Sequence, residues 1–147
     1  MERIKAADLT TLKPAKRARV DREGPVHIAC LNWLRGSLPG ALVHHSPNEM
    51  SITADRISKA IAQSKSKKLG MVPGFPDLLV LWQGHAWFIE VKAPGGRLTE
   101  KQQAVGLDIA ANGHRFGVVW SLEDCQALVR EWRKDVVVRA PMKGSVT

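Results

Sequence analysis

Two carboxylates and an amine are spaced along the middle of the chain so that a single hairpin would bring them together. Asp77 starts one apolar run, and Glu90 and Lys92 end the next. Gln83-Gly84, between the two runs, is a turn signal. A two-residue turn there pairs position 77 with position 90, and opposed Cβ atoms lie about 4.5–5.5 Å apart. Glu90 and Lys92 would share this face, because side chains alternate along a strand.

This set of side chains predicts metal-assisted hydrolysis of phosphodiester bonds. Like charges opposed in a sheet destabilise it, and a divalent metal between Asp77 and Glu90 would turn the repulsion into binding. Mg²⁺ prefers oxygen ligands, neutralises charge on a phosphate and lowers the pKa of an attacking water. Lys92 would orient that water or stabilise the charged transition state.

The alternative is a surface hairpin that carries a Glu–Lys pair on its solvent-exposed face. Residues 78–81 and 87–89 beside the charges are strongly apolar, however. This pattern favours a charged site at the end of a buried hairpin.

The composition favours a polyanionic partner. The chain has 147 residues and a net charge of +8, from 22 Lys and Arg against 14 Asp and Glu. This length predicts one domain with its own core, and the charge predicts nucleic acid or an anionic membrane surface as partner. We expect no membrane, because no apolar run approaches the ~18 residues of a spanning helix and no signal peptide is evident. Cys30 and Cys125 have no zinc spacing and are predicted to be buried thiols in a reducing compartment, the cytoplasm.

The elements around the hairpin predict an α/β fold with a mixed central sheet flanked by helices. Thr53 is a candidate N-cap, Thr99 and Gln102 fit a capping box, and Gly113 is a helix stop. The expected helices cover residues 24–36, 53–69, 99–112 and 121–133, and the expected strands cover 41–45, 77–82, 85–92 and 115–120, with 136–138 as a candidate edge strand.

Basic residues gather in two segments outside the hairpin. Residues 1–22 form a basic arm that is predicted to be disordered and solvated, or else to contact phosphates on DNA. The second expected helix has a basic side that is either solvated or in contact with the DNA backbone. Gly95-Gly96 before Arg97 would let DNA approach, or would simply connect strand to helix. The expected DNA contacts are Arg56, Lys59, Lys65, Lys67, Lys68 and Arg97.

The central block resembles a known nuclease family. The residues that carry the resemblance are the run 74–79 (Gly-Phe-Pro-Asp-Leu-Leu), the run 88–99 (Phe-Ile-Glu-Val-Lys-Ala-Pro-Gly-Gly-Arg-Leu-Thr) and Gln102. Together they resemble the VRR-NUC domain, a branch of the PD-(D/E)XK nuclease superfamily, over roughly residues 23–132. The chain looks most like the stand-alone, phage-type members. We therefore expect one nuclease domain over residues 23–140 and a frayed tail over 141–147.

The resemblance implies a restriction-endonuclease-like core that uses Mg²⁺ or Mn²⁺. Its implied metal ligands are Asp77, Glu90 and the Val91 main-chain carbonyl, with Lys92 as the catalytic lysine and Gln102 near the active site. The glutamate of the family's first helix aligns with Glu23, a further implied ligand. Gly24-Pro25 follows directly, which predicts that Glu23 sits just outside the helix.

The resemblance also implies a substrate and a partner. Stand-alone members are similar to Holliday-junction resolvases and act as homodimers, and a two-fold dimer suits two symmetric cuts in a four-way junction. We therefore expect a structure-selective DNA endonuclease of phage or prophage DNA processing, in a bacterial or phage-infected cell. The alternatives are another nuclease on the same core (nickase, flap or restriction-type) and a non-catalytic basic module that binds DNA.

Overall fold

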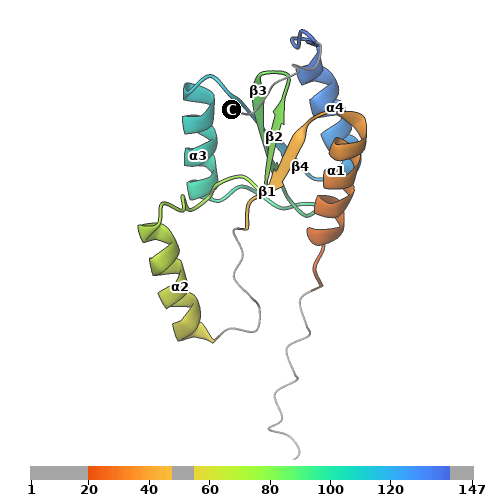
Figure 1. The fold of residues 1–147 in the computed structure, drawn as a ribbon. Coiled ribbons are helices and arrows are strands. Elements are labelled where there is room, and N and C mark those ends of the chain that lie inside the picture. The colour runs from red at the N-terminus through yellow and green to blue at the C-terminus, as the bar shows by residue number, and fades with distance from the viewer. Residues whose placement is uncertain (1–19, 48–54, 140–147) are drawn as a thin grey trace, which may run out of the picture.

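The computed structural model describes residues 20–47 and 55–139. The predicted order of elements is confirmed within these residues (Figure 1). The helices are α1 (Gly24–Ser37), α2 (Arg56–Lys68), α3 (Glu100–Ala111) and α4 (Leu122–Arg133), and the strands are β1 (Leu42–His45), β2 (Leu78–Trp82), β3 (His85–Val91) and β4 (Arg115–Val119).

The four strands form one mixed sheet in the order β1-β2-β3-β4. β2 is antiparallel to both β1 and β3, whereas β3 and β4 are parallel. Gln83 and Gly84 both have positive φ, at 51° and 81°. This backbone twist matches the right-handed twist of a hairpin, so the tight turn fixes the register. Leu78 lies opposite Ile89, which is the predicted register.

Helices cover both faces of the sheet (Figure 1). α1 and α4 pack on one face, where the fully buried Leu34, Trp87 and Val129 belong to the main core. α3 covers the other face. A Cβ on Gly106 of α3 would lie 2.4 Å from the Phe116 ring of β4, so only glycine allows this close approach. The predicted fold class, α/β with a mixed sheet flanked by helices, is confirmed.

The predicted helix ends in the second half of the chain are also confirmed. Thr99 and Gln102 form a capping box at the start of α3, and Gly113 follows its end with a φ of 82°. The Ser121 hydroxyl accepts a hydrogen bond from the Asp124 backbone N–H at the start of α4. Cys30 and Cys125 are buried free thiols, as predicted.

Two predictions about local structure are wrong. α2 begins at Arg56 with Asp55 as its N-cap, where a helix from residue 53 capped by Thr53 was expected, because the Asp55 carboxylate accepts the Ser58 backbone N–H at 2.6 Å. Thr53 itself lies outside the described residues. Residues 136–138 form no strand, although three valines favour one. The Arg139 backbone N–H instead bonds the Gln83 side chain at the β2–β3 turn, which carries the chain past the end of the sheet.

α2 differs from the other three described helices because none of its residues is buried. It stands apart from the sheet and its flanking helices (Figure 1). Its apolar side chains face solvent, with Ile57 73% and Ile61 64% exposed. None of the described helices has the length and apolar character needed to cross a bilayer. Most of the predicted basic arm (1–19) and the predicted tail (141–147) lie outside the described residues.

Candidate metal centre

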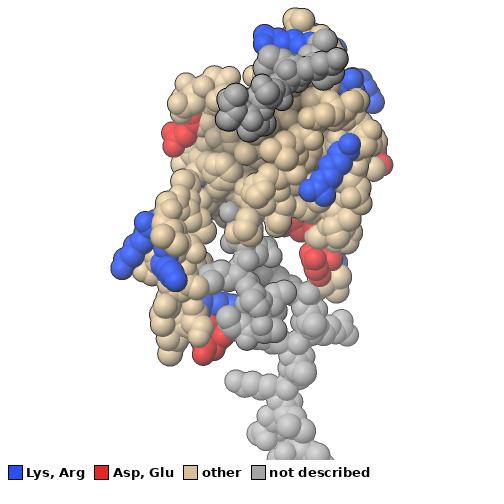
Figure 2. Space-filling view, viewed as in Figure 1, with Lys and Arg blue, Asp and Glu red and all other residues tan. Residues whose placement is uncertain are grey.

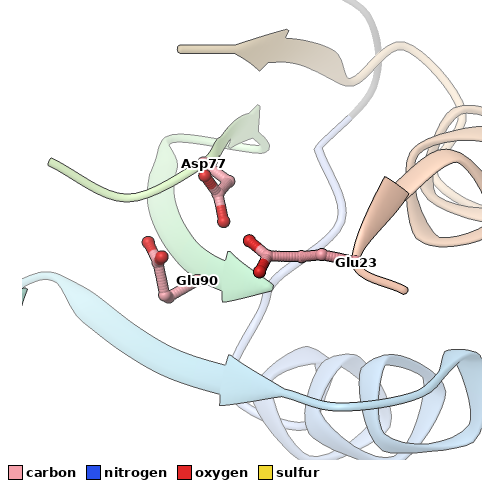
Figure 3. Close-up of side chains that lie close together, drawn as sticks. All are labelled: Glu23, Asp77 and Glu90. Atoms are coloured by element: carbon pink, nitrogen blue, oxygen red, sulfur yellow. The ribbon is translucent and has the colours of Figure 1, made fainter. Parts of the chain in front are cut away.

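Three carboxylates converge at one end of the sheet. One oxygen each from Glu23, Asp77 and Glu90 lies within 4.8 Å of the other two. Figure 3 shows the three side chains pointing toward a shared space, one from the start of α1 and two from the β2–β3 hairpin. They come from positions as far as 67 residues apart in sequence, so the fold brings them together.

The hairpin places Asp77 and Glu90. The pairing of Leu78 with Ile89 puts the residue before β2 opposite Glu90, as the sequence predicted. The Asp77 Oδ2 atom accepts a hydrogen bond of 2.9 Å from the Val91 backbone N–H. This bond fixes the carboxylate against the end of β3 and leaves its other oxygen available to a ligand.

The third carboxylate is placed by the start of α1. Glu23 directly precedes the helix, as Gly24-Pro25 predicted. The Asp21 Oδ1 atom accepts the backbone N–H groups of Glu23 and Gly24 at 3.1 and 2.9 Å. A Cβ on Gly24 would lie 2.2 Å from Asp21 Oδ2, so glycine lets this cap close. The sequence analysis missed Asp21, although an acidic residue just before a Gly-Pro helix start is a recognisable capping signal.

Glu90 is an almost fully buried acidic residue. It is only 2% exposed, and its Oε2 atom has no hydrogen-bond partner among the described residues. Burial and the neighbouring Asp77 charge raise the pKa of Glu90 to about 8, although Lys92 opposes the change. A buried carboxylate oxygen without a partner is costly, and a bound cation would satisfy it.

Two further side chains contact Glu90 on its Oε1 side. The Lys92 ammonium lies 3.7 Å from Glu90 Oε1, with its side chain 12% exposed. Gln102 Nε2 donates to the same oxygen at 2.7 Å, while Gln102 Oε1 accepts the Thr99 backbone N–H. The predicted capping box and a contact with Glu90 are therefore both present in one side chain.

These residues line an open cavity of about 290 Å³ that suits a hard divalent cation. Its donors are carboxylate oxygens, the ligands that Mg²⁺ and Mn²⁺ accept, and the unpartnered Glu90 Oε2 is one of them. Lys101 also lines the cavity. The sequence analysis did not select Lys101. Its position next to Gln102 was the only sequence signal for it.

The predicted DNA contacts do not line this cavity. The five basic residues of the second expected helix all lie on α2, where Lys59 is half-buried and the other four are exposed. Arg97 is exposed in the loop after β3. In Figure 2 blue lysine and arginine surface lies over α2, whereas red acidic surface appears at the lower end of α1. The structure thus separates a basic helix from the acidic centre.

Comparisons with known proteins agree with this geometry. Residues 21–122 match the VRR-NUC domain family. One solved structure, titled "VRR_NUC domain protein", is 22% identical with a TM-score of 0.58 and covers 79% of this chain and 91% of that chain. A second, titled "VRR_NUC domain", is 23% identical with a TM-score of 0.54 and covers 77% of this chain and 99% of that chain. At these identities the two structures support the fold alone. No curated protein matches the chain.

Proposed function

This chain belongs to the VRR-NUC domain family, and on that premise we propose that it is a divalent-metal-dependent, structure-selective DNA endonuclease. The family indicates a nuclease, and a nuclease domain implies DNA binding. The observation that carries the proposal is the convergence of Glu23, Asp77 and Glu90 within 4.8 Å, beside the Lys92 ammonium. Carboxylates this close repel one another, and a bound cation would offset that repulsion.

The carboxylates and the Val91 main-chain carbonyl are the proposed ligands of Mg²⁺ or Mn²⁺. When bound there, the cation would neutralise charge on the scissile phosphate and lower the pKa of the attacking water. The orphaned Oε2 of Glu90 and the oxygen of Asp77 not used by Val91 are the atoms best placed to bind it. Glu90 must lose its proton on binding, because its raised pKa keeps it protonated near neutral pH.

The remaining residues of the centre orient these ligands and the substrate. Lys92, held near Glu90, would stabilise the negative charge that builds on the phosphate in the transition state. Gln102 holds Glu90 through its amide and is itself held by the start of α3. Lys101 lines the same cavity and is placed to contact a neighbouring phosphate.

The proposed substrate is branched DNA, and the proposed assembly is a homodimer that makes two symmetric cuts. The exposed basic residues of α2, together with Arg97, would contact phosphates of the duplex arms. Two apolar surfaces support a second copy as partner. Leu42 and Leu81 are paired in the sheet yet 63% and 42% exposed, and Ile57 and Ile61 of α2 are uncovered. Contact between these surfaces across a two-fold axis would bury both.

The test is a cleavage assay on a labelled four-way junction and a matched linear duplex, with Mg²⁺ or Mn²⁺, for wild type and Asp77→Ala. We expect paired symmetric cuts in the junction that are lost in the variant. Cleavage of both substrates would retain the nuclease and overturn the preference for branched DNA. Metal-independent binding without any cleavage would favour a non-catalytic DNA-binding module. Light scattering on wild type and Ile61→Asp tests the dimer, and a monomeric wild type would overturn it.

A further inference from the structure

A second pocket adjoins the metal centre on the side of α1. It is open, has a volume of about 390 Å³, and shares Glu23 and Asp77 with the carboxylate cluster. Its size falls within the range of small-molecule sites. Because the two cavities share these side chains, a group in the second pocket lies directly beside whatever occupies the metal centre.

The walls of this pocket combine apolar and aromatic side chains. Ile28 and Leu31 of α1 line it, and Ile28 is 59% exposed. His27 of α1 and His45 of β1 also line it, with ring centroids 4.6 Å apart and planes at 86°. An apolar side chain left exposed beside two ring systems is suited to stack against a flat, aromatic group.

The charge of the pocket favours a hydrogen-bond donor over a phosphate as its occupant. Asp21, Glu23 and Asp77 bring three carboxylates to it, and no lysine or arginine is among the described residues that line it. Carboxylates accept hydrogen bonds from amino groups, as cytosine, adenine and guanine carry on their pairing edges.

We propose that this pocket takes up one unpaired nucleobase of the DNA, next to the phosphate that is cut. The proposal rests on the proposed nuclease function, since it assumes that the scissile phosphate lies at the carboxylate cluster. Of the groups beside a scissile phosphate, only a base offers a flat face to the pocket's apolar and imidazole walls and amino groups to its carboxylates.

The pocket thereby gives a physical reason for selecting altered DNA structure. Extracting a base from an intact duplex costs a few kcal/mol, and the cost is smallest where the base is already unpaired. An enzyme that needs this base outside the stack therefore favours mismatched, flapped or branched DNA over regular duplex.

The experiment uses the full chain and a DNA substrate that wild type cuts. After the cut is mapped, an abasic site is placed opposite each nucleotide that flanks it, which unpairs that nucleotide and leaves the cut strand unchanged. We expect cleavage to accelerate about tenfold at one flanking position, in line with the stacking of one base. A 2-aminopurine at that position should brighten on binding, measured with Lys92→Ala protein so that the DNA stays intact.

Substitutions in the pocket should abolish this preference. Ile28→Ser removes an exposed apolar wall, and His45→Ala removes an exposed ring, so neither change should unfold the chain. For each variant we compare the cleavage rate of the substrate with the unpaired flanking nucleotide with that of the fully paired substrate. We expect the ratio of these two rates to fall toward one in both variants. Leu107→Ser is the matched control, because Leu107 is an exposed leucine (72%) on α3 outside the pocket, and it should keep the wild-type ratio.

The outcomes separate this inference from the proposed function. If wild type cuts no DNA with either metal, the nuclease proposal and the base pocket both fail. If wild type cuts DNA but an unpaired nucleotide at any flanking position leaves the cleavage rate unchanged, only the base pocket is overturned. An unchanged ratio in both Ile28→Ser and His45→Ala would overturn it as well.

Discussion

Gln102 Nε2 donates a hydrogen bond of 2.7 Å to Glu90 Oε1, and so ties the first turn of α3 to the buried carboxylate of β3. The same side chain closes the capping box, with its oxygen accepting the Thr99 backbone N–H at 2.9 Å. The cap therefore fixes which way the amide faces. A helix-capping interaction and the orientation of a proposed metal ligand depend on one residue.

Exchanging the Gln102 amide for a carboxylate should separate these two roles. Gln102→Glu keeps an oxygen for the Thr99 N–H but loses the donor to Glu90. We expect cleavage to slow about 10–100-fold, as is usual when a residue that orients a metal ligand is lost, with little change in thermal stability. Thr99→Ala is the complement, because it should cost about 1 kcal/mol of stability while Gln102 stays in place. Wild-type turnover by folded Gln102→Glu would contradict the orienting role.

Lys92 should matter for the chemical step far more than for binding. Its side chain is 12% exposed and lies 3.7 Å from Glu90 Oε1. We expect Lys92→Ala to slow single-turnover cleavage about 10²–10³-fold, the loss typical of a group that stabilises transition-state charge. The dissociation constant for DNA should change less than threefold. Lys134→Ala removes the same charge from an exposed pair with Glu131 and should cleave normally. If Lys92→Ala and Lys134→Ala slowed cleavage equally, the loss would come from the lower net charge of the chain rather than from the position of Lys92.

The raised pKa of Glu90 predicts how stability depends on pH without metal. Between its ordinary pKa of 4.5 and about 8, the folded protein holds a proton on Glu90 that the unfolded chain has released. The free energy of unfolding should therefore fall as pH rises through this window, by at most about 1.4 kcal/mol per unit from this group. Glu90→Gln cannot ionise, so its stability relative to wild type should grow from pH 5 to pH 8.

Denaturant unfolding in EDTA at several pH values measures this difference. Other titrating groups are common to both proteins and cancel. Adding Mn²⁺ at pH 8 should stabilise wild type and leave Glu90→Gln nearly unchanged, since a cation that binds only the folded state raises its stability. Parallel curves for the two proteins across the window would show that Glu90 is already ionised in the folded state.

The hairpin was predictable because its geometry is local. A tight turn at Gln83-Gly84 fixes the register, and alternation then fixes the faces, so the opposition of Asp77 and Glu90 follows from the sequence. The capping box at Thr99 was predictable for the same reason, because all its groups lie within one turn.

The third carboxylate was not predictable from spacing. Glu23 reaches the hairpin because α1 packs across the sheet, and only the family resemblance pointed to it. The base pocket likewise joins His27 of α1 to His45 of β1, and nothing in their spacing of 18 residues predicts that contact. α2 carries a thin apolar side, yet these side chains have no partner among the described residues.

Gly74 should control the position of α3 relative to the metal centre. Its φ is +84°, and a Cβ there would lie 2.7 Å from the Lys101 carbonyl carbon in the α3 backbone. Gly74→Ala therefore strains the chain just before Asp77 and pushes on the first turn of α3. We expect a loss of roughly 1–3 kcal/mol in the free energy of unfolding and slower cleavage. Gly36→Ala, in α1 with open space around it, is the control and should not destabilise. Full stability of Gly74→Ala would show that α3 can shift freely.

The basic side chains of α2 should determine how DNA binding depends on salt. Each lysine that contacts a phosphate contributes about 0.9 to the slope of log K against log salt. We expect Lys67→Ala with Lys68→Ala to weaken binding equally for all sequences and to reduce the slope by about two. The matched control is Arg130→Ala on α4 with Lys134→Ala just after its end, which removes the same net charge from exposed positions. Equal slopes for the two double variants would show that the total charge of the chain, rather than α2, attracts DNA. A lower slope for the α2 variant alone would place the duplex arms against this helix.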